Sequence, residues 1–253
     1  MLCDMCYVKI LGIRIDKVSK EEALKKVSSF FGSNKQHTIF TPNPEILVDA
    51  QKDAYFREIL NEGDLNLCDG FGLSVFARTK RIPGVDFMVE LCQLAEQKNY
   101  SVYFLGSGSE QIIKNLKLAI GRQFPNIKIA GAHQGYQLPI TNYQLQMDTE
   151  KNNELVADIV TTQPDILFVA FGHNKQEKWI YENLKDLPSV RIAMGVGGAF
   201  DFISGNKKRA PKWMRQVGLE WLYRLVQEPN RFKRIWKATG VFVYYFIFKN
   251  IQQ

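Results

Sequence analysis

Cysteines, histidines and long apolar runs are scarce in this sequence of 253 residues. Only two of its four cysteines, Cys3 and Cys6, lie close together, and this single C-x-x-C lacks the second ligand pair of a zinc site and precedes the first strand-like run. No run approaches the ~20 apolar residues that span a bilayer, and the first ten residues lack the basic start and apolar core of a signal peptide. These absences predict a cytoplasmic protein without a metal site or a membrane-spanning helix.

The glycine fingerprint of dinucleotide-binding enzymes is also missing. Such enzymes carry G-x-G-x-x-G after the first strand and an acidic residue ~20 positions further on, and residues 10–22 do not show this arrangement. Residues 106–111, GSGSEQ, lack the third glycine and lie in the middle of the chain. A nucleotide-binding oxidoreductase is therefore only an alternative interpretation.

The net charge of +7 is concentrated at one end of the chain. Residues 207–253 contain eleven lysines and arginines against two glutamates, a charge of +9, which leaves −2 for residues 1–206. The asymmetry predicts a near-neutral body, residues 1–206, and a basic appendage, residues 207–253, that meets an anionic partner. Nucleic acid would be one such partner, and an affinity for DNA that falls steeply with salt would support it.

Strand-like and helix-like segments alternate through the body. Residues 7–15 are apolar and β-branched, and the helix-like segment after them begins with a potential capping box of Ser19 and Glu22. After a short strand at residues 37–41, Asn43 followed by proline predicts the start of a helix. Strand, turn and helix recur from residues 64, 100, 164 and 190. The order predicts an α/β fold with a Rossmann-like, largely parallel sheet and a helical, basic C-terminal appendage.

The residues that follow these strands are small, polar or acidic. In a parallel sheet the turns after the strands lie along one edge, where ligands bind. Each residue has an ordinary structural explanation, such as a helix cap at Asn43 or an Asx turn at Asp69. Their convergence, with a basic segment immediately afterwards, favours a binding site. Its predicted members are Thr41, Asn43, Asp69, Gly70, Gly106, Gly108, Gly172, Lys175, Gln176, Gly195, Gly197 and Gly198.

Five segments carry a resemblance to a known family. They read TPNPE at residues 41–45, CDGFG at 68–72, GHNKQEKW at 172–179, GVGGAFDFISG at 195–205 and RAPKWMRQVGLEWLYRLVQEPNRFKR at 209–234. In order and approximate spacing they resemble the WecG/TagA/CpsF family of bacterial glycosyltransferases, from about Val8 to Lys237. The last two segments are long enough to make a chance match improbable.

The resemblance implies a reaction, its partners and its place in the cell. Family members transfer N-acetylmannosamine, its uronic acid or a related amino sugar from a UDP donor to undecaprenyl-diphosphate-linked N-acetylglucosamine, with no cofactor expected. They act at the inner face of the membrane in the synthesis of teichoic acid or other surface polysaccharides. The resemblance thus implies a peripheral membrane enzyme with no nucleic-acid partner, and it is compatible with a homo-oligomer, a dimer or a trimer.

The diphosphate of a departing UDP needs positive charge or oriented N–H donors. Many glycosyltransferases supply the charge with a metal held by a D-x-D pair, and this sequence contains no such pair. Helix N-termini after the turns at Gly106 and Gly195, together with arginines, are expected to replace the metal. The resemblance implies that the appendage folds over the site. Its candidate arginines are Arg209, Arg215, Arg224 and Arg231.

Attack by an acceptor hydroxyl requires a base, and a carboxylate in the crevice is suited to that role. Asp69 lies at the expected edge and, by resemblance, matches the family's proposed base, with Asp86 and Glu45 as weaker alternatives. One base suffices for an inverting reaction in a single displacement. The residues expected to hold the acceptor or the donor sugar are Thr41, Asn43 and Gln176.

Aromatic residues are interleaved with the lysines and arginines of the appendage. The apolar run at residues 241–248, VFVYYFIF, is too short to span a bilayer but, flanked by cations, is typical of a helix that lies in a membrane interface. The appendage is therefore expected to dock on anionic lipid. Packing of the aromatic side chains against the body, as ordinary core, is the alternative. These aromatics include Trp213, Trp221, Tyr223 and Trp236.

Overall fold

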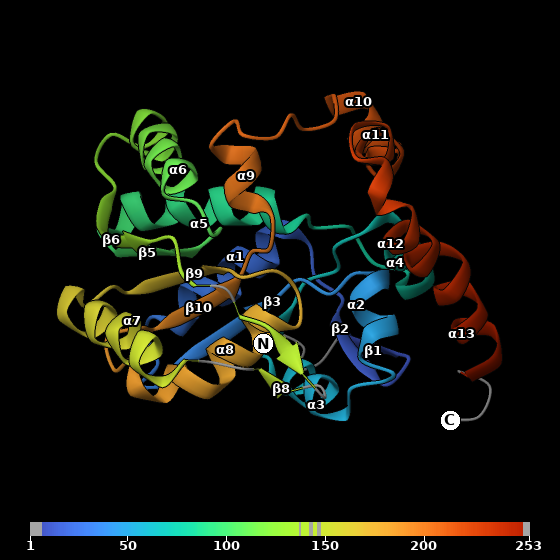
Figure 1. The fold of residues 1–253 in the computed structure, drawn as a ribbon, viewed down its shortest axis with the longest axis horizontal. Helices are drawn as coiled ribbons and strands as arrows, with labels where there is room; N and C mark the ends of the chain where they lie inside the picture. Colours follow the sequence, from blue (N-terminus) through green and yellow to red (C-terminus); the bar gives the residue numbers. More distant parts are fainter. Residues whose placement is uncertain (1–6, 137, 142–143, 146–147, 250–253) are drawn as a thin grey trace.

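The computed structural model describes residues 7–136, 138–141, 144–145 and 148–249, so that Cys3 and Cys6 lie outside the described residues. Its centre is a six-stranded sheet in which every pairing is parallel (Figure 1). In spatial order the strands are β4 (Leu65–Asn66), β3 (His37–Phe40), β10 (Ile192–Gly195), β9 (Ile166–Ala170), β5 (Ser101–Gly106) and β6 (Lys128–His133). The predicted α/β fold with a largely parallel sheet is confirmed.

Helices cover both faces of this sheet, so the body has three layers. One face packs against α1 (Lys20–Phe30), α5 (Gly84–Lys98), α6 (Glu110–Gln123) and α9 (Ala199–Ile203). The other face packs against α2 (Pro44–Asp49), α3 (Ala54–Glu62), α7 (Thr149–Thr162) and α8 (Lys175–Asn183). Figure 1 shows α5, α6 and α9 above the sheet and α7 and α8 below it.

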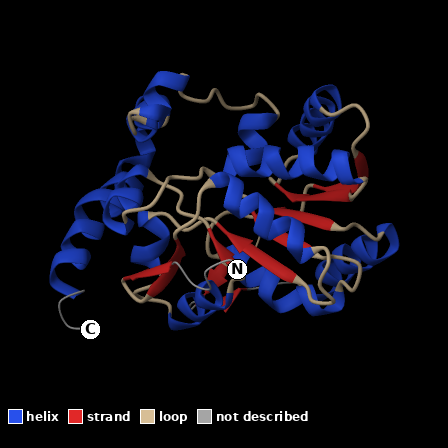
Figure 2. Cartoon of the chain, turned by 180° about the vertical axis from the view of Figure 1, so that it is seen from behind, coloured by secondary structure: helices blue, strands red, loops and turns tan. Residues whose placement is uncertain are grey.

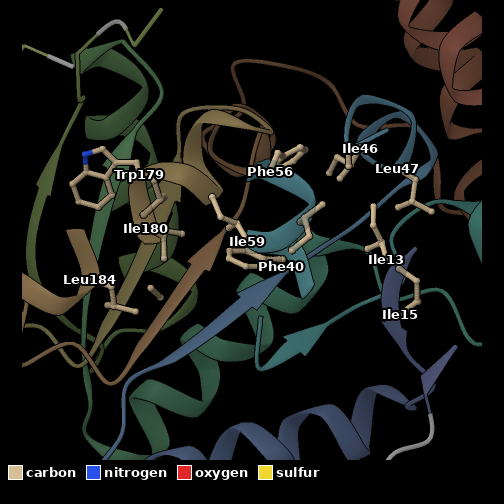
Figure 3. Close-up of a cluster of buried hydrophobic side chains, with 14 of the residues drawn as sticks. Ile13, Ile15, Phe40, Ile46, Leu47, Phe56, Ile59, Trp179, Ile180 and Leu184 are labelled. Carbon is tan, nitrogen blue, oxygen red and sulfur yellow. The ribbon is translucent and has the colours of Figure 1, made fainter. Parts of the chain in front are cut away.

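Alternation of side chains along the central strands divides the core between the two helical layers. On β9, Ile166 and Phe168 are buried on the α5 side, whereas Leu167 and Val169 are buried on the α8 side. Because both faces are covered, the central strands are continuous apolar runs. Figure 3 shows the α8 side of this core, including Ile180.

Residues 7–15 do not form a strand of the parallel sheet. Together with Asp16 they form β1 (Tyr7–Ile10) and β2 (Ile13–Asp16), which pair antiparallel with each other in a separate sheet. Leu11 and Gly12 reverse the chain with positive φ angles of 52° and 75°, as in a tight hairpin turn. The apolar pattern continues across the reversal, which is why composition alone gives no sign of it.

Several other elements have no counterpart among the predicted segments. These are the edge strand β6, the helices α3, α5 and α7, and the antiparallel pair β7 (Ile140–Thr141) and β8 (Gln144–Leu145). In contrast, α4 (Phe71–Ala77) follows β4 and Asp69 as the sequence predicts. A short 3₁₀ helix, Leu184–Asp186, ends the α8 segment.

Helix starts follow the local sequence signals. The backbone N–H of Glu22 donates to Ser19 Oγ at 3.2 Å, and the backbone N–H of Ser19 donates to Glu22 Oε2 at 2.7 Å, so the predicted capping box is confirmed. At α2, the backbone N–H of Ile46 donates to Asn43 Oδ1 at 3.0 Å, and Pro44 occupies the first helical position. Asn43 therefore fixes the start of α2 directly after β3, at the carboxyl edge of the sheet.

Residues 207–249 run as short helices along one side of the body, which Figure 2 shows from behind. They are α10 (Lys212–Gln216), α11 (Glu220–Gln227), a 3₁₀ turn (Pro229–Arg231), α12 (Phe232–Trp236), a π-helical turn (Lys237–Val241) and α13 (Phe242–Lys249). Phe242 is fully buried, and its ring centroid lies 5.4 Å from that of Phe76 on α4. We call residues 207–249 the tail. Within the described part of the chain, no helix combines the length and apolar character needed to cross a bilayer.

Candidate functional site

Two adjoining cavities lie at the carboxyl edge of the parallel sheet. The sheet-edge cavity, of about 490 Å³, is lined by turns after the strands, among them those at Thr41, Ser107 and Gly197. The tail cavity, of about 430 Å³, lies between α4 and the tail and is lined by Phe71 and Trp221, among others. Five residues line both cavities and therefore mark their junction. They are Asn43, Asp69, Arg224, Arg231 and Arg234.

Most of the residues predicted from the strand ends meet at these cavities. This agrees with the expectation that the turns after parallel strands lie along one edge. Gly70 lines the tail cavity. Those that line the sheet-edge cavity are Thr41, Asn43, Asp69, Gly172, Lys175, Gln176, Gly197 and Gly198.

Three predicted glycines line neither cavity; two of them permit close packing, and the third makes a backbone hydrogen bond. A Cβ on Gly106 would lie 2.7 Å from the backbone of Ala170, so glycine permits the close approach of β5 and β9. A Cβ on Gly195 would lie 2.8 Å from Nε2 of Gln176. The backbone N–H of Gly108 donates to the carbonyl oxygen of Gln134. Ser107, which lies between Gly106 and Gly108, does line the sheet-edge cavity.

Asp69 lies at the junction of the cavities, immediately before α4. Its Oδ2 accepts from the backbone N–H of Gly84 at 3.3 Å, and its Oδ1 lies 3.8 Å from Nε of Arg81. Burial raises the pKa of the Asp69 carboxyl, and the opposing effects of Arg81 and the Gly84 N–H leave a pKa above its ordinary value. A carboxylate with a raised pKa at the meeting point of two cavities is suited to accept a proton.

The two alternative bases are engaged with the tail. Asp86, in the first turn of α5, accepts from both terminal nitrogens of Arg209 and lines neither cavity. Glu45 lines the tail cavity, but Arg234 donates to both of its oxygens, with Nε–Oε1 and Nη2–Oε2 distances of 2.9 Å. These ion pairs disfavour proton transfer by either carboxylate.

The structure divides the four predicted arginines into two pairs. Arg224 and Arg231 line both cavities, next to Asp69. Arg209 and Arg215 line neither cavity. Nη2 of Arg209 lies 3.0 Å from Oδ2 of Asp86 in the body, and Nη1 of Arg215 lies 3.8 Å from Oδ1 of the same residue. The second pair therefore fastens the tail to the body and is not positioned to meet a ligand in either cavity.

Two arginines at the site were not predicted. Arg234 lies three residues after Arg231, a helical spacing that puts both on one face, and this spacing was the available signal. Arg81 lines the tail cavity, and its Nη2 donates to Oε2 of Glu220 at 2.8 Å. The two residues of that pair are 139 positions apart, so no local pattern reveals it.

Glu220 is the buried centre of the arginine cluster. Its carboxylate pairs with Arg81 and Arg209, and with Arg224 at 3.2 Å. Burial alone would raise the pKa of Glu220, but the three arginines outweigh it and hold the pKa below its ordinary value. Glu220 therefore stays ionised and holds Arg224 beside the cavities.

One group among the described residues has the spacing of metal ligands. Ligand atoms of Glu45, Asp49 and His173 lie within 4.8 Å of one another. Lys237 Nζ, however, donates to both oxygens of Asp49, at 2.8 and 3.1 Å, and Arg234 pairs with Glu45. Two tail cations thus already neutralise the acids that a metal ion would need.

Sequence comparison relates the chain to a known family and to named proteins. The model of the Glycosyl transferase WecG/TagA/CpsF family matches residues 8–253. An N-acetylglucosaminyldiphosphoundecaprenol N-acetyl-beta-D-mannosaminyltransferase of Bacillus subtilis (strain 168) is 37% identical, over 78% of this chain and 74% of the relative. The protein of the same name from Staphylococcus aureus (strain MW2) is 31% identical, over 94% of this chain and 91% of the relative. The chain belongs to the WecG/TagA/CpsF family of glycosyltransferases.

Proposed function

We propose that this enzyme transfers N-acetylmannosamine from a UDP donor to undecaprenyl-diphosphate-linked N-acetylglucosamine. The names of the relatives give the transferred sugar and the lipid-linked acceptor. The observation that carries the proposal is the position of Asp69, a carboxylate with a raised pKa, where two cavities of different character meet. A group-transfer reaction needs such a base between two substrates.

The sheet-edge cavity has the character of a nucleotide-sugar site. Glycine turns at Gly172 and Gly197 bring backbone close to the ligand space, and Lys175 and Lys207 add positive charge. Ligands of parallel α/β sheets bind in this place. We therefore assign the UDP donor to this cavity, with Thr41 beside the sugar.

The tail cavity suits a diphosphate attached to a lipid. Phe71, Trp221 and Ile235 give it apolar walls, and Arg234, which also pairs with Glu45, supplies a planar cation for phosphate oxygens. Trp221 is 44% exposed and Phe71 is 48% exposed, so the apolar walls continue to the surface of the protein. We assign the acceptor to this cavity.

In the proposed reaction, Asp69 takes the proton of the acceptor hydroxyl as its oxygen attacks the anomeric carbon of the donor. The bond between that carbon and the UDP oxygen breaks, and the negative charge that develops on the diphosphate is stabilised by Arg224 and Arg231. The carboxylates of Glu45 and Glu220 are paired with arginines. A single base at the junction corresponds to an inverting displacement.

We further propose that residues 1–206 form the catalytic body and that residues 207–253 complete the site and hold the enzyme on the inner face of the cell membrane. All six strands of the parallel sheet precede residue 207, and the tail contributes three arginines to the junction. Large apolar side chains of the tail are exposed beside its cations, as in an interfacial helix. Assembly of the protein into a dimer or a trimer is still a prediction that rests on the family resemblance.

The direct test is release of UDP from a panel of UDP-amino sugars in the presence of a short-chain lipid-diphosphate N-acetylglucosamine acceptor. Acceptor-dependent release from UDP-N-acetylmannosamine is expected. Preference for UDP-N-acetylmannosaminuronic acid would replace the proposed donor sugar but leave the proposed type of reaction unchanged. Release from none of the donors would overturn the proposed function.

A further inference from the structure

Two adjacent buried side chains form a hydrogen-bonded relay behind the sheet-edge cavity. The backbone N–H of Gly197 donates to Oε1 of Gln176 at 2.8 Å. Nε2 of Gln176 in turn donates to Oε1 of Glu177 at 2.9 Å. Gln176 is 3% exposed and Glu177 is 1% exposed, so water does not compete for these bonds.

The surroundings of Gln176 leave its amide little freedom. A Cβ on Gly195 would lie 2.8 Å from Nε2 of Gln176, so this glycine makes room for the amide. Gly197 itself has a φ of +53°, and nothing lies within 4 Å of the place where its Cβ would be. The turn at Gly197 is thus held from behind by Gln176 and faces the open cavity, which it lines.

The two ends of a glutamine amide have almost the same shape, so packing alone does not choose between them. Only the oxygen can accept from Gly197. An acceptor on the opposite side, Oε1 of Glu177, draws the NH₂ group to itself and leaves the oxygen facing Gly197. The carboxyl of Glu177 therefore selects the orientation of the amide that holds the turn.

Burial of the Glu177 carboxyl lowers the stability of the fold, a cost that a side chain with only a structural role would not need to impose. Oε2 of Glu177 is buried and has no hydrogen-bond partner among the residues that the structure describes. Burial raises the pKa of the Glu177 carboxyl and outweighs the lowering effects of Gln176 and of nearby backbone N–H groups. A buried polar atom without a partner destabilises a fold, and an apolar side chain of similar size would remove the cost.

We propose that Glu177 is a positioning residue for nucleotide binding, which acts through Gln176 to hold the Gly197 turn in the conformation that accepts the donor. The proposal rests on the assignment of the UDP donor to the sheet-edge cavity. It gives Gln176 a role in addition to the predicted contact with the donor sugar, because each end of its amide makes a hydrogen bond within the protein.

The test measures two quantities, the dissociation constant of UDP by calorimetry and the thermal midpoint of unfolding, on the full-length protein. Glu177→Met keeps the length of the side chain and removes both oxygens, and should weaken UDP binding about tenfold, the equivalent of one buried hydrogen bond. Its thermal midpoint should stay close to that of the wild type, because loss of the unpartnered Oε2 offsets loss of the hydrogen bond from Gln176 Nε2. Glu177→Gln keeps an acceptor oxygen and should retain most of the affinity.

A double-mutant cycle separates action through Gln176 from a direct effect. Gln176→Met should weaken UDP binding by about the same factor, and adding Glu177→Met to it should have little further effect. Glu177→Leu replaces Glu177→Met in the cycle if the methionine variant does not fold. Unchanged UDP affinity in the apolar Glu177 variant, or additive effects of the two substitutions, would overturn the proposal. Failure of the wild type to bind UDP would instead overturn the donor assignment.

Discussion

Arg209 donates hydrogen bonds to both carboxylate oxygens of Asp86, and this contact fastens the start of the tail to the first turn of α5. The same contact engages Arg209, which was predicted to bind phosphate, and Asp86, which was predicted as an alternative base. Glu220, on α11 of the tail, accepts from Arg81 of the body. These ion pairs hold the tail against the body, where Arg224 and Arg231 line both cavities together with Asp69.

Arg209→Gln should loosen the tail without removing a ligand-contacting group. Asp86 is nearly half exposed, so the ion pair contributes about 1 kcal/mol to docking of the tail. Hydrogen exchange of backbone amides in residues 207–249 should therefore speed up about fivefold relative to the wild type.

The matched control for this variant is Arg231→Gln, which removes a cation from the junction. Arg231 pairs with Glu228 inside the tail and with no residue of the body among those described. Its loss should lower turnover while protection of the tail amides near residue 209 stays at the wild-type level. Unchanged exchange in Arg209→Gln would show that the ion pair does not hold the tail.

The acidic limb of the pH–rate profile should report Asp69. A base must be ionised, and burial keeps the pKa of Asp69 above its ordinary value. Activity is then lost as the pH falls through the pKa of Asp69, which lies above the ordinary aspartate pKa. Glu220 has a lowered pKa and stays ionised over that interval, so the tail remains docked. Measurement of kcat/KM against pH tests this, and a limb at or below the ordinary aspartate pKa would contradict it.

Features of the fold that depend on neighbouring residues could be predicted from the sequence. The Ser19 capping box and the Asn43 cap were found because their partners are three residues away. The reversal at Leu11 was missed because the apolar pattern runs through it. The central strands were recognised because they are buried on both faces and read as apolar runs.

The site was predictable to the extent that sheet geometry determines it. Turns after parallel strands must share an edge, and this brought Thr41, Asp69 and Lys175 together from the sequence alone. The tail follows no such rule. Whether an arginine such as Arg209 meets a ligand or a carboxylate of the body depends on tertiary contacts between distant residues, and those contacts leave no periodic signal.

Activity should survive removal of divalent metals by EDTA. Three arginines line the junction where the diphosphate charge would develop, and they can replace a cation there. Tail cations already pair with Glu45 and Asp49 in the one described group that has metal-ligand spacing. The check is turnover after dialysis against EDTA. Loss of turnover that magnesium or manganese restores would contradict the arginine mechanism.

Binding to membranes should depend on the exposed side of α13. Phe242 packs against the body, whereas Ile247 is 47% exposed and Phe248 is 59% exposed. Replacement of Ile247 and Phe248 by serine should weaken binding to anionic vesicles about tenfold, since the apolar surface that enters the interface is lost. Wild-type binding should fall as salt screens the tail cations.

Leu118→Ser on α6 is the matched control, because Leu118 is 51% exposed on a helix of the body, away from the tail in Figure 1. It should leave vesicle binding unchanged, as measured by co-sedimentation. Equal weakening by the control and by the α13 substitutions would show that the tail is not the membrane-binding surface.

The most direct test of the proposed mechanism is turnover of Asp69→Asn, measured alongside its affinity for UDP. The substitution keeps the shape of the side chain and removes its basicity. We expect turnover to fall about 10²-fold or more, the usual contribution of a general base, with UDP affinity and the thermal midpoint nearly unchanged. Asp201→Asn, at a carboxylate that lines only the sheet-edge cavity, should lower turnover far less. Turnover of Asp69→Asn close to that of the wild type would contradict the assignment of Asp69 as the base.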